Sequence, residues 1–280
     1  MLIVYFYSSQ LMMANIKLLF TCPHGGKNDD GTKNDDGTPI NPPIIRRYTI
    51  PPDNNICPAA EGEGFNGIND KLTLELTQAI VKNITNLSGK DPYAVYAEFN
   101  RRWIDYNRTE TCAYEQHICN SKAQEKYLIY HNNILQIIEE MLPQGDNTMA
   151  FLFDIHGTDR ERSPEPPHHF IELLVGTDQA NSRKALTDAE FWNEEKGLIP
   201  LLGTKNIRAY PEYLSQEMHK FPLDGGYTIK EYGSKRMKPG LVAIQIEVIN
   251  CIRDNRYCRE KFAADMSDCI LKFVSPFIPT

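Results

Sequence analysis

Short apolar runs alternate with longer amphipathic segments along the chain, and this alternation predicts strands and helices in turn. Continuous apolar runs predict buried strands over residues 16–22, 149–155 and 170–175, each stopped by a turn-forming residue. Residues 241–249 alternate strictly, with isoleucine and valine side chains on one side of the strand and Gln245 and Glu247 on the other. Residues 93–98 could begin a strand or a short turn, and residues 205–210 could form a further strand.

Helical spacing of apolar residues fills the intervals between these strands. The stripe of Leu72, Leu76 and Ile80 predicts a helix over 72–84 that begins near Asn69 or Asp70. Further helices are expected over 121–142, 183–198 and 258–274. Strands that alternate with helices predict an α/β fold in a single domain: a mainly parallel mixed sheet with helices on both faces.

Two stretches fall outside this alternation. The motif KNDDGT occurs twice in tandem over 27–38, and proline-rich sequence follows, so residues 27–68 are interpreted as a loop insertion. Residues 1–13 are interpreted as an N-terminal extension that need not be native, because a start at Met13 leads directly into the first strand. The apolar residues before it are too few to span a membrane and make a poor signal peptide. The domain is therefore placed at 14–280.

Composition and net charge limit the classes of partner that the chain is expected to bind. The formal net charge is −7 and the sequence pI is about 5.6, with no block of lysine and arginine. Nucleic acid is excluded as an expected partner, because phosphate binding needs a basic face. No membrane association is expected, and the oligomeric state is left open.

The number and spacing of the cysteines are informative about the cellular compartment of the protein. The seven cysteines contain no CxxC pair, which gives no support for a structural zinc knuckle. Cys112 could bridge to Cys119, and Cys251 to Cys258, in an oxidising compartment; free thiols in a cytoplasmic protein are the preferred interpretation, with secretion as the alternative. Of three glycosylation sequons, at Asn83, Asn86 and Asn107, the last lies in a candidate active-site motif.

The candidate chemistry lies where the predicted strands end. His24-Gly25 follows the first strand and His156-Gly157 follows the second. Ligands of open α/β sheets bind beyond the carboxyl ends of the strands, and imidazole is a good zinc ligand at neutral pH. Each histidine alone could be an ordinary loop residue, but the pair predicts a metal site.

A catalytic zinc site needs a third protein ligand. Asp70, at the start of the helix 72–84, is the preferred candidate, although a carboxylate there could equally be a helix N-cap. Asp29 and Asp30 are rivals within the duplicated loop. His168 and His169, adjacent in a proline-rich stretch, are interpreted as surface loop.

Two further groups could act on a substrate. Glu247 is the candidate general base, which would take a proton from a water and pass it to the leaving amine; the alternative is an exposed strand glutamate. Arg108 beside Asn107 could clamp a substrate carboxylate bidentately, and the alternative there is a structural Asp–Arg pair.

The order of these motifs resembles that of the N-formylglutamate amidohydrolase family, which is similar to the zinc carboxypeptidases. The resemblance spans roughly residues 16–273 and rests on eight short motifs taken together. These are PHGG at 23–26, D-x-x-T-x-E-L at 70–76, D-x-N-R at 105–108, YH at 130–131, FDIHG at 153–157, VGT at 175–177, DGGYT at 224–228 and AIQIE at 243–247.

The resemblance implies a phosphorylase/hydrolase-like fold of the zinc carboxypeptidase type and a metal-dependent amidohydrolase acting on linear amides. By position it makes His24 and His156 zinc ligands, Asn107 and Arg108 the carboxylate site, and Glu247 the base. The related carboxypeptidases carry a glutamate three residues after the first histidine. Lys27 stands there in this chain, and the motif that begins at Asp70 resembles the displaced acid and helix.

We therefore expect a zinc hydrolase that cleaves the amide of a small anionic N-acyl amino acid such as N-formylglutamate. Zinc is expected on His24, Asp70 and His156, with Glu247 and Arg108 catalytic. Asn107 and Arg108 are expected to bind substrate, together with a loop at Gly225, Gly226 and Tyr227 that closes over the acyl side. Arg160 or Arg253 could neutralise the oxyanion. The alternatives are a zinc carboxypeptidase or γ-glutamyl peptide hydrolase, or a non-catalytic binding protein of the same fold.

Overall fold

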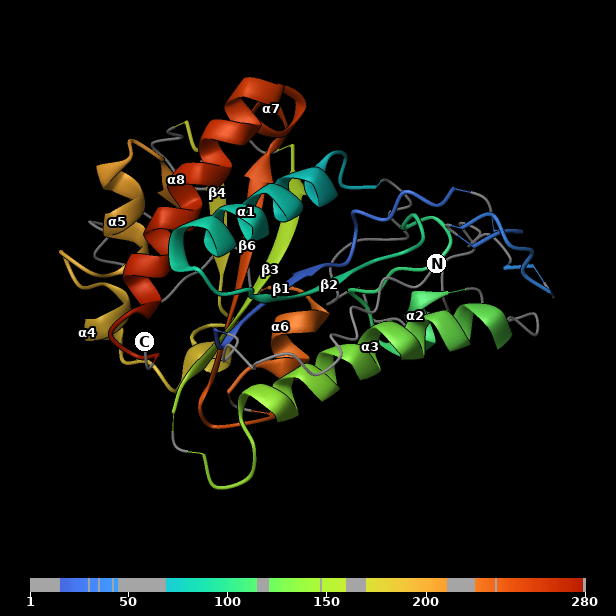
Figure 1. Cartoon of the computed structure of the whole chain (residues 1–280), viewed down its shortest axis with the longest axis horizontal. Helices are drawn as coiled ribbons and strands as arrows, with labels where there is room; N and C mark the ends of the chain where they lie inside the picture. Colours follow the sequence, from blue (N-terminus) through green and yellow to red (C-terminus); the bar gives the residue numbers. More distant parts are fainter. Residues whose placement is uncertain are drawn as a thin grey trace.

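The protein is a single α/β domain in which one twisted sheet lies between two layers of helices (Figure 1). In this computed structural model the described residues are 16–29, 31–34, 36–41, 43–44, 69–114, 121–146, 148–159, 170–210, 225–234 and 236–278. The expected extension 1–13, most of the insertion 27–68, Asp30, Arg160, His168 and His169 lie outside them.

Six strands form the sheet, in the order β2-β1-β3-β6-β4-β5. The central strands β1, β3 and β6 and the edge strand β2 run parallel, whereas β4 is antiparallel to β6. The bounds are β1 Leu18–Cys22, β2 Tyr93–Tyr96, β3 Ala150–Thr158, β4 Leu173–Gly176, β5 Ala209–Tyr210 and β6 Leu241–Ile249. The predicted mainly parallel mixed sheet is confirmed.

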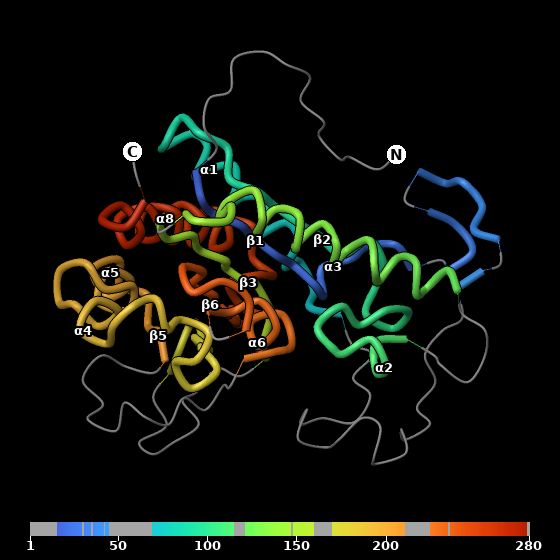
Figure 2. The backbone as a smooth tube through the Cα atoms, turned by 90° about the horizontal axis from the view of Figure 1, so that it is seen from below, coloured from blue at the N-terminus to red at the C-terminus, as the bar shows by residue number. Residues whose placement is uncertain are grey.

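The helices divide between the two faces of the sheet. The longer ones are α1 (Thr73–Ser88), α3 (Ser121–Met141) and α8 (Arg256–Val274), and they match three of the predicted helices. The shorter ones are α2 (Glu110–Ala113), α4 (Asp188–Phe191), α5 (Leu198–Thr204), α6 (Tyr227–Tyr232) and α7 (Asn250–Asp254), with a 3₁₀ turn η2 at Asn181–Arg183. Figure 1 shows α1 and α8 on one side of the sheet with α3 and α6 on the other, and Figure 2 shows the same elements from below, with α3 in front.

Two expectations about element boundaries were wrong. The single helix expected over 183–198 is instead the turn η2 and the short helix α4, followed by α5, because Thr187 caps a new helix start and Gly197 begins another. The strand expected to end before His156 continues through Thr158, because β6 pairs with β3 over its whole length. His156 is therefore a residue of the strand itself and not of a loop after it.

The core has two parts, one on each face of the sheet. On one face, aromatic and branched side chains such as Phe20, Phe153 and Ile244 pack against α1, α5 and α8. On the other face, Leu19, Leu152 and Ala243 pack against α3 and α6. The inward and outward alternation predicted for 241–249 is thus confirmed, and the second face carries the polar residues at the carboxyl ends of β1, β3 and β6.

Candidate metal centre

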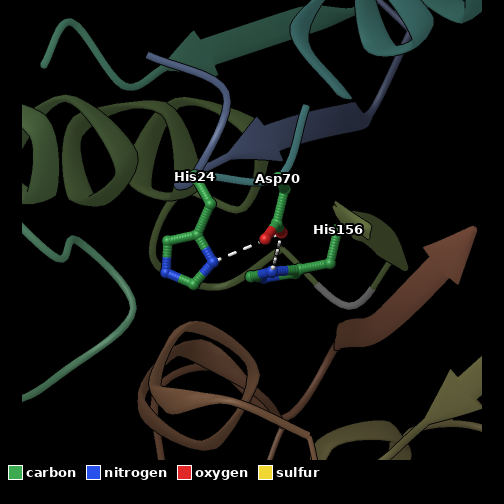
Figure 3. Close-up of side chains that lie close together, drawn as sticks. All are labelled: His24, Asp70 and His156. Atoms are coloured by element: carbon green, nitrogen blue, oxygen red, sulfur yellow. Dashed lines mark hydrogen bonds and ion pairs between the residues drawn. The ribbon is translucent and has the colours of Figure 1, made fainter. Parts of the chain in front are cut away.

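His24, Asp70 and His156 lie together at the carboxyl ends of β1 and β3 (Figure 3). One ligand atom from each residue falls within 4.8 Å of the other two. His24 follows β1 and His156 is in β3, the neighbouring parallel strand, so the expected position of the two histidines on adjacent strands is confirmed. Both side chains are buried.

Asp70 reaches the histidines from the segment just before α1. Its main-chain N–H donates to the carbonyl of His24 at 3.2 Å, and Asn69 Nδ2 donates to the Gly26 carbonyl at 3.0 Å. These bonds bring Asp70 next to His24 although 45 residues lie between them in the sequence. The chain then makes a left-handed turn at Leu72, with φ of 59°, and enters the helix.

The carboxylate of Asp70 does not cap the helix. The cap position is Leu72, and no side chain bonds to the first turn from it. Asp70 Oδ2 instead lies 3.4 Å from His24 Nδ1 and 3.2 Å from His156 Nδ1, and it accepts a bond from the Gly157 N–H at 3.0 Å. The N-cap alternative for Asp70 is therefore wrong.

The rival Asp29 lies elsewhere. Its carboxylate pairs with Arg102 and its side chain is 48% exposed, outside the group formed by the two histidines and Asp70. Lys27, three residues after His24, pairs with Glu75 of α1 at 2.9 Å.

Each histidine is held from behind by a second carboxylate. His24 Nε2 lies 2.7 Å from Asp105 Oδ1, and His156 Nε2 lies 2.9 Å from Asp154 Oδ2. Asp105 and Asp154 are themselves fully buried and fixed, the first by Arg101 and the second by the Thr21 hydroxyl. A carboxylate on the far nitrogen of a ligating histidine is the usual support of a metal site.

The two carboxylates determine which nitrogen of each imidazole ring carries the proton. If each Nε2 carries the proton and donates it to a carboxylate, each neutral ring turns the lone pair of Nδ1 toward Asp70. Three acceptor atoms then face one another, which is unfavourable unless a cation lies between them. His24 Nδ1 is buried without a hydrogen-bond partner. Ligand atoms around a tetrahedral zinc, at about 2.0–2.1 Å from it, lie roughly 3.3 Å apart, close to the 3.2 and 3.4 Å measured here. The residues fit a zinc ion.

The electrostatics of the metal-free centre agree with this. Burial opposes the charged form of His156, but Asp154 and Asp70 outweigh it and raise the pKa of His156 to about 10. Burial likewise opposes ionisation of Asp70, and the two histidines nevertheless hold the pKa of this carboxyl well below its usual range. The pocket thus favours positive charge between the histidines and Asp70, which a proton supplies here and a metal cation could supply equally.

Glu247 lies on β6 directly beside His156, its register partner on β3. It is on the same face of the sheet as the histidine, as the alternation predicted. Burial, together with the charge of Asp70, raises the pKa of Glu247, whereas His156 and the bond from Gln245 Nε2 at 2.9 Å lower it. The alternative of an exposed strand glutamate is therefore wrong.

Arg108 and Asn107 approach the site from the loop before α2. Arg108 Nε is 3.8 Å from Asp105 Oδ2, so the Asp–Arg pair exists, and the Arg108 side chain keeps 18% exposure. The Asn107 amide is buried: its Oδ1 accepts bonds from the N–H and the hydroxyl of Thr228, and its Nδ2 lies 3.3 Å from His156 Nε2. Asn107 is too enclosed for a glycan.

The loop at Gly225, Gly226 and Tyr227 is also next to the centre. Gly225 has a φ of 82° and precedes α6, which begins at Tyr227. Tyr227 is half-buried against His131, with ring centroids 5.6 Å apart. The Arg253 guanidinium is held by the main chain, because it donates to the carbonyls of Val248, Lys71 and Thr158. An oxyanion role for Arg253 stays a prediction.

Several residues of the site were not predicted from the sequence. Asp154 precedes His156 by two positions on a strand, so both side chains must lie on one face, and this spacing could have identified it. Asp105 stood in the D-x-N-R motif without an assigned partner. Gln245 and Thr228 stood in the motifs AIQIE and DGGYT without an assigned role, because their roles arise only where α6 packs on β6. Burial raises the pKa of Cys22, below the site, so no thiolate is available there as a ligand.

One cysteine differs from expectation. Cys112 is disulfide-bonded, so the interpretation that all thiols are free was wrong for this residue. Its partner lies outside the described residues. Cys251 and Cys258 are not joined to each other.

No helix within the described ranges is long and apolar enough to cross a membrane.

Comparison with known proteins identifies the fold. No family model and no curated protein matches the sequence. Among solved structures, an N-formylglutamate amidohydrolase from Ralstonia eutropha is similar with a TM-score of 0.56 and 13% identity, covering 94% of each chain. A gene product of Agrobacterium tumefaciens is similar with a TM-score of 0.54 and 14% identity, covering 94% of this chain and 91% of that one. The resemblance expected from the motifs is confirmed for the fold, which this chain shares with the N-formylglutamate amidohydrolase structure.

Proposed function

We propose that this protein is a zinc-dependent hydrolase that cleaves the amide bond of a small anionic N-acyl amino acid, such as N-formylglutamate. The single observation that carries the proposal is the convergence of His24 Nδ1, His156 Nδ1 and Asp70 Oδ2, with a carboxylate behind each histidine. A fold shared with an N-formylglutamate amidohydrolase supports it.

His24, Asp70 and His156 are proposed to hold the zinc through three ligand atoms, which leaves one tetrahedral position open. Zinc in such a site supplies Lewis acidity, which polarises a carbonyl and makes a water more acidic. Asp105 and Asp154 keep the two imidazole rings in the tautomer and orientation that ligation needs.

Glu247 is the proposed general base. It takes a proton from the attacking water at a carboxylate oxygen and delivers it to the nitrogen of the leaving amine. It lies on β6 beside His156 of β3, and burial raises its pKa, which makes its carboxylate a stronger proton acceptor. Gln245, which donates to Oε1, favours the ionised form that can accept the proton.

Arg108 is the proposed anchor for the substrate carboxylate. It is the cation beside the centre that retains solvent exposure, and its guanidinium can bind a carboxylate through two parallel bonds. Asn107 stands beside Arg108 with its amide buried against Thr228 and His156, and Gly225, Gly226 and Tyr227 are proposed to line the acyl side of the substrate site. The expected absence of nucleic acid as a partner stays a prediction.

Two measurements test this function. Purified folded protein should contain about one zinc per chain by elemental analysis, and it should release formate from N-formylglutamate faster than it cleaves C-terminal or γ-glutamyl peptides. Protein that binds no zinc would overturn the proposal. Zinc binding with cleavage of peptides alone would favour the second candidate, a peptidase of the same mechanism, and zinc binding without hydrolysis of any of these would favour a binding protein.

The compartment remains a prediction as well. A cytoplasmic location was expected, but the disulfide at Cys112 favours the alternative, a secreted protein, because such bonds persist in oxidising compartments. Peptide mapping of the native protein without reductant would decide: a fully reduced Cys112 restores the cytoplasmic interpretation.

A further inference from the structure

Two buried carboxamides connect the turn at Gly225–Thr228 to the proposed metal centre. Gln245 Oε1 accepts a bond from the Gly226 N–H, and Gln245 Nε2 donates to Glu247 at 2.9 Å. Asn107 Oδ1 accepts from the Thr228 N–H at 2.9 Å, and Asn107 Nδ2 lies 3.3 Å from His156 Nε2. In each case the amide oxygen holds the turn and the amide nitrogen faces a site residue.

The two contacts differ in kind. Gln245 makes a full hydrogen bond to the carboxylate of Glu247. His156 Nε2 has only one hydrogen-bonding position, and Asp154 Oδ2 is nearer to it at 2.9 Å than Asn107 Nδ2 at 3.3 Å. His156 Nε2 therefore donates its proton to Asp154, and the Asn107 amide only packs against the edge of the His156 ring. The bonds from Thr228 to Asn107 Oδ1 hold the Asn107 amide on that side of the His156 ring.

The turn has no room for side chains where the carboxamides meet it. A Cβ on Gly226 would lie 1.9 Å from Asn107 Nδ2, and a Cβ on Gly225 would lie 2.0 Å from Ile229 Cδ1. Gly225 also has a left-handed φ of 82°. Two successive glycines are thus required for the main chain to approach both Asn107 and Gln245.

We propose that the Gly225–Thr228 turn positions the metal ligand His156 and the base Glu247 together, and that Asn107 and Gln245 are the positioning residues through which it does so. This rests on the proposed function but assigns Asn107 a different task from binding a substrate carboxylate, which is left to Arg108. Displacement of the turn should therefore change metal affinity as well as turnover.

The variant Gly226→Ala tests whether the turn acts on His156 through Asn107. The added methyl meets the Asn107 amide and disturbs its packing against His156, so zinc affinity measured by competition with a chelator should fall severalfold, less than the about 10- to 100-fold loss that follows removal of a hydrogen-bonded support. In an Asn107→Ala background the same methyl has nothing to displace, and Gly226→Ala should add less than about twofold. Gly203→Ala in α5, where a Cβ meets nothing within 4 Å, is the matched control and should leave zinc affinity unchanged.

Kinetics test both positioning residues against the anchor. Asn107→Ala and Gln245→Leu should lower kcat with little change in KM, whereas Arg108→Ala should raise KM with zinc affinity unchanged. Gln245→Glu keeps an acceptor for Gly226 N–H and should retain zinc affinity while losing turnover, because it places a carboxylate against Glu247. Zinc affinity of Gly226→Ala within twofold of the unmodified protein, or additive effects of Gly226→Ala and Asn107→Ala, would overturn the proposal.

A metal-free readout separates this inference from the proposed function. In the zinc-free protein with ¹⁵N-labelled histidine, Gly226→Ala should shift the ring signals of His156, and Gly203→Ala should leave them in place. If the unmodified protein binds no zinc, the proposed function fails, and the histidine spectra alone then decide the inference. Unchanged His156 signals in Gly226→Ala would overturn it in that case.

Discussion

The two faces of the sheet carry the same strands and perform different tasks. Phe153 and Asp154 are consecutive residues of β3, and their side chains point in opposite directions: Phe153 into the apolar core beneath α1 and α8, Asp154 toward His156. On the first face the residues remain apolar along the whole of β3 and β6. On the second face they are apolar at the start of the strands and polar at the carboxyl ends.

This difference shows how a fold can position charged groups without losing its stability. The polar residues of the second face occur at one level of three adjacent strands, where they satisfy one another, and the cost of their burial is limited to that level. The first face supplies continuous apolar burial to offset it. Substitutions on the first face should therefore change stability, and substitutions on the second face should change metal affinity and rate.

The largest effect is expected at the metal ligand. His156→Ala removes one of three ligand atoms and should abolish stoichiometric zinc binding and reduce hydrolysis to background. The fold should persist, because the apolar face is untouched, and circular dichroism checks this. Retention of both zinc and activity in His156→Ala would refute the assignment of the site while leaving the class of enzyme open.

On the opposite face, Phe153→Ala should lower the free energy of unfolding by about 3–5 kcal/mol, the usual cost of truncating a fully buried phenylalanine. Denaturant titration measures this. Zinc affinity per folded molecule should stay within a few-fold. A large loss of zinc affinity without a loss of stability would show that the two faces are not independent.

Glu247→Gln should reduce kcat by roughly 10²–10⁴, the contribution of a general base, with zinc still bound. Because burial raises the pKa of Glu247, its ionised form is disfavoured in the folded protein, and the neutral glutamine should leave stability unchanged or slightly higher. Unimpaired turnover in Glu247→Gln would remove Glu247 from the mechanism.

Asp154→Asn should weaken zinc binding about 10- to 100-fold, as expected when the carboxylate behind a ligating histidine is neutralised. Thr21 can still donate to the asparagine oxygen, so most of the packing is kept. The pair Phe153→Ala and Asp154→Asn is the sharpest test of the comparison, since two adjacent residues should give separate effects. Similar losses of stability in both would contradict it.

The smallest effect concerns His131, buried on the second face between Tyr127, Tyr130 and Tyr232. Burial lowers the pKa of His131 to about 4, although Asp154 and the Tyr106 backbone oppose the shift. The unfolded chain, with an ordinary pKa near 6.5, binds the proton more readily, so stability is lost as pH falls from 6.5 toward 4. Between pH 6.5 and 5 the loss should be on the order of 1 kcal/mol, and His131→Gln should reduce it. An unchanged slope in that variant would refute the assignment.

The sequence could predict those parts of the molecule that repeat a simple period. The alternation over 241–249 and the stripe in 121–142 each correspond to an observed element, β6 and α3. The region 183–198 was predicted wrongly from periodicity, which does not show that a new helix starts at the Thr187–Glu190 capping box. The packing of α5 against α8 could not be predicted from any local pattern.

For the site, the order of motifs was enough to choose His24, Asp70, His156 and Glu247. Their convergence depends on β1 and β3 being neighbours in the sheet, which no local pattern states. The roles of Asn107 and Gln245 needed the packing of α6 on β6, a contact between segments far apart in the chain.

The closure at Asp70 has a consequence for how the chain can vary. The Asp70 N–H bond to the His24 carbonyl and the Asn69 bond to Gly26 join the two ends of the intervening segment directly at the metal centre. The separation of the ligands along the sequence is therefore uncoupled from their separation in space, and loop-closure entropy grows only slowly with length. The interval can therefore differ in length while the ligand spacing stays constant, provided that Ile40 and Ile44, which are buried in the core, keep their places.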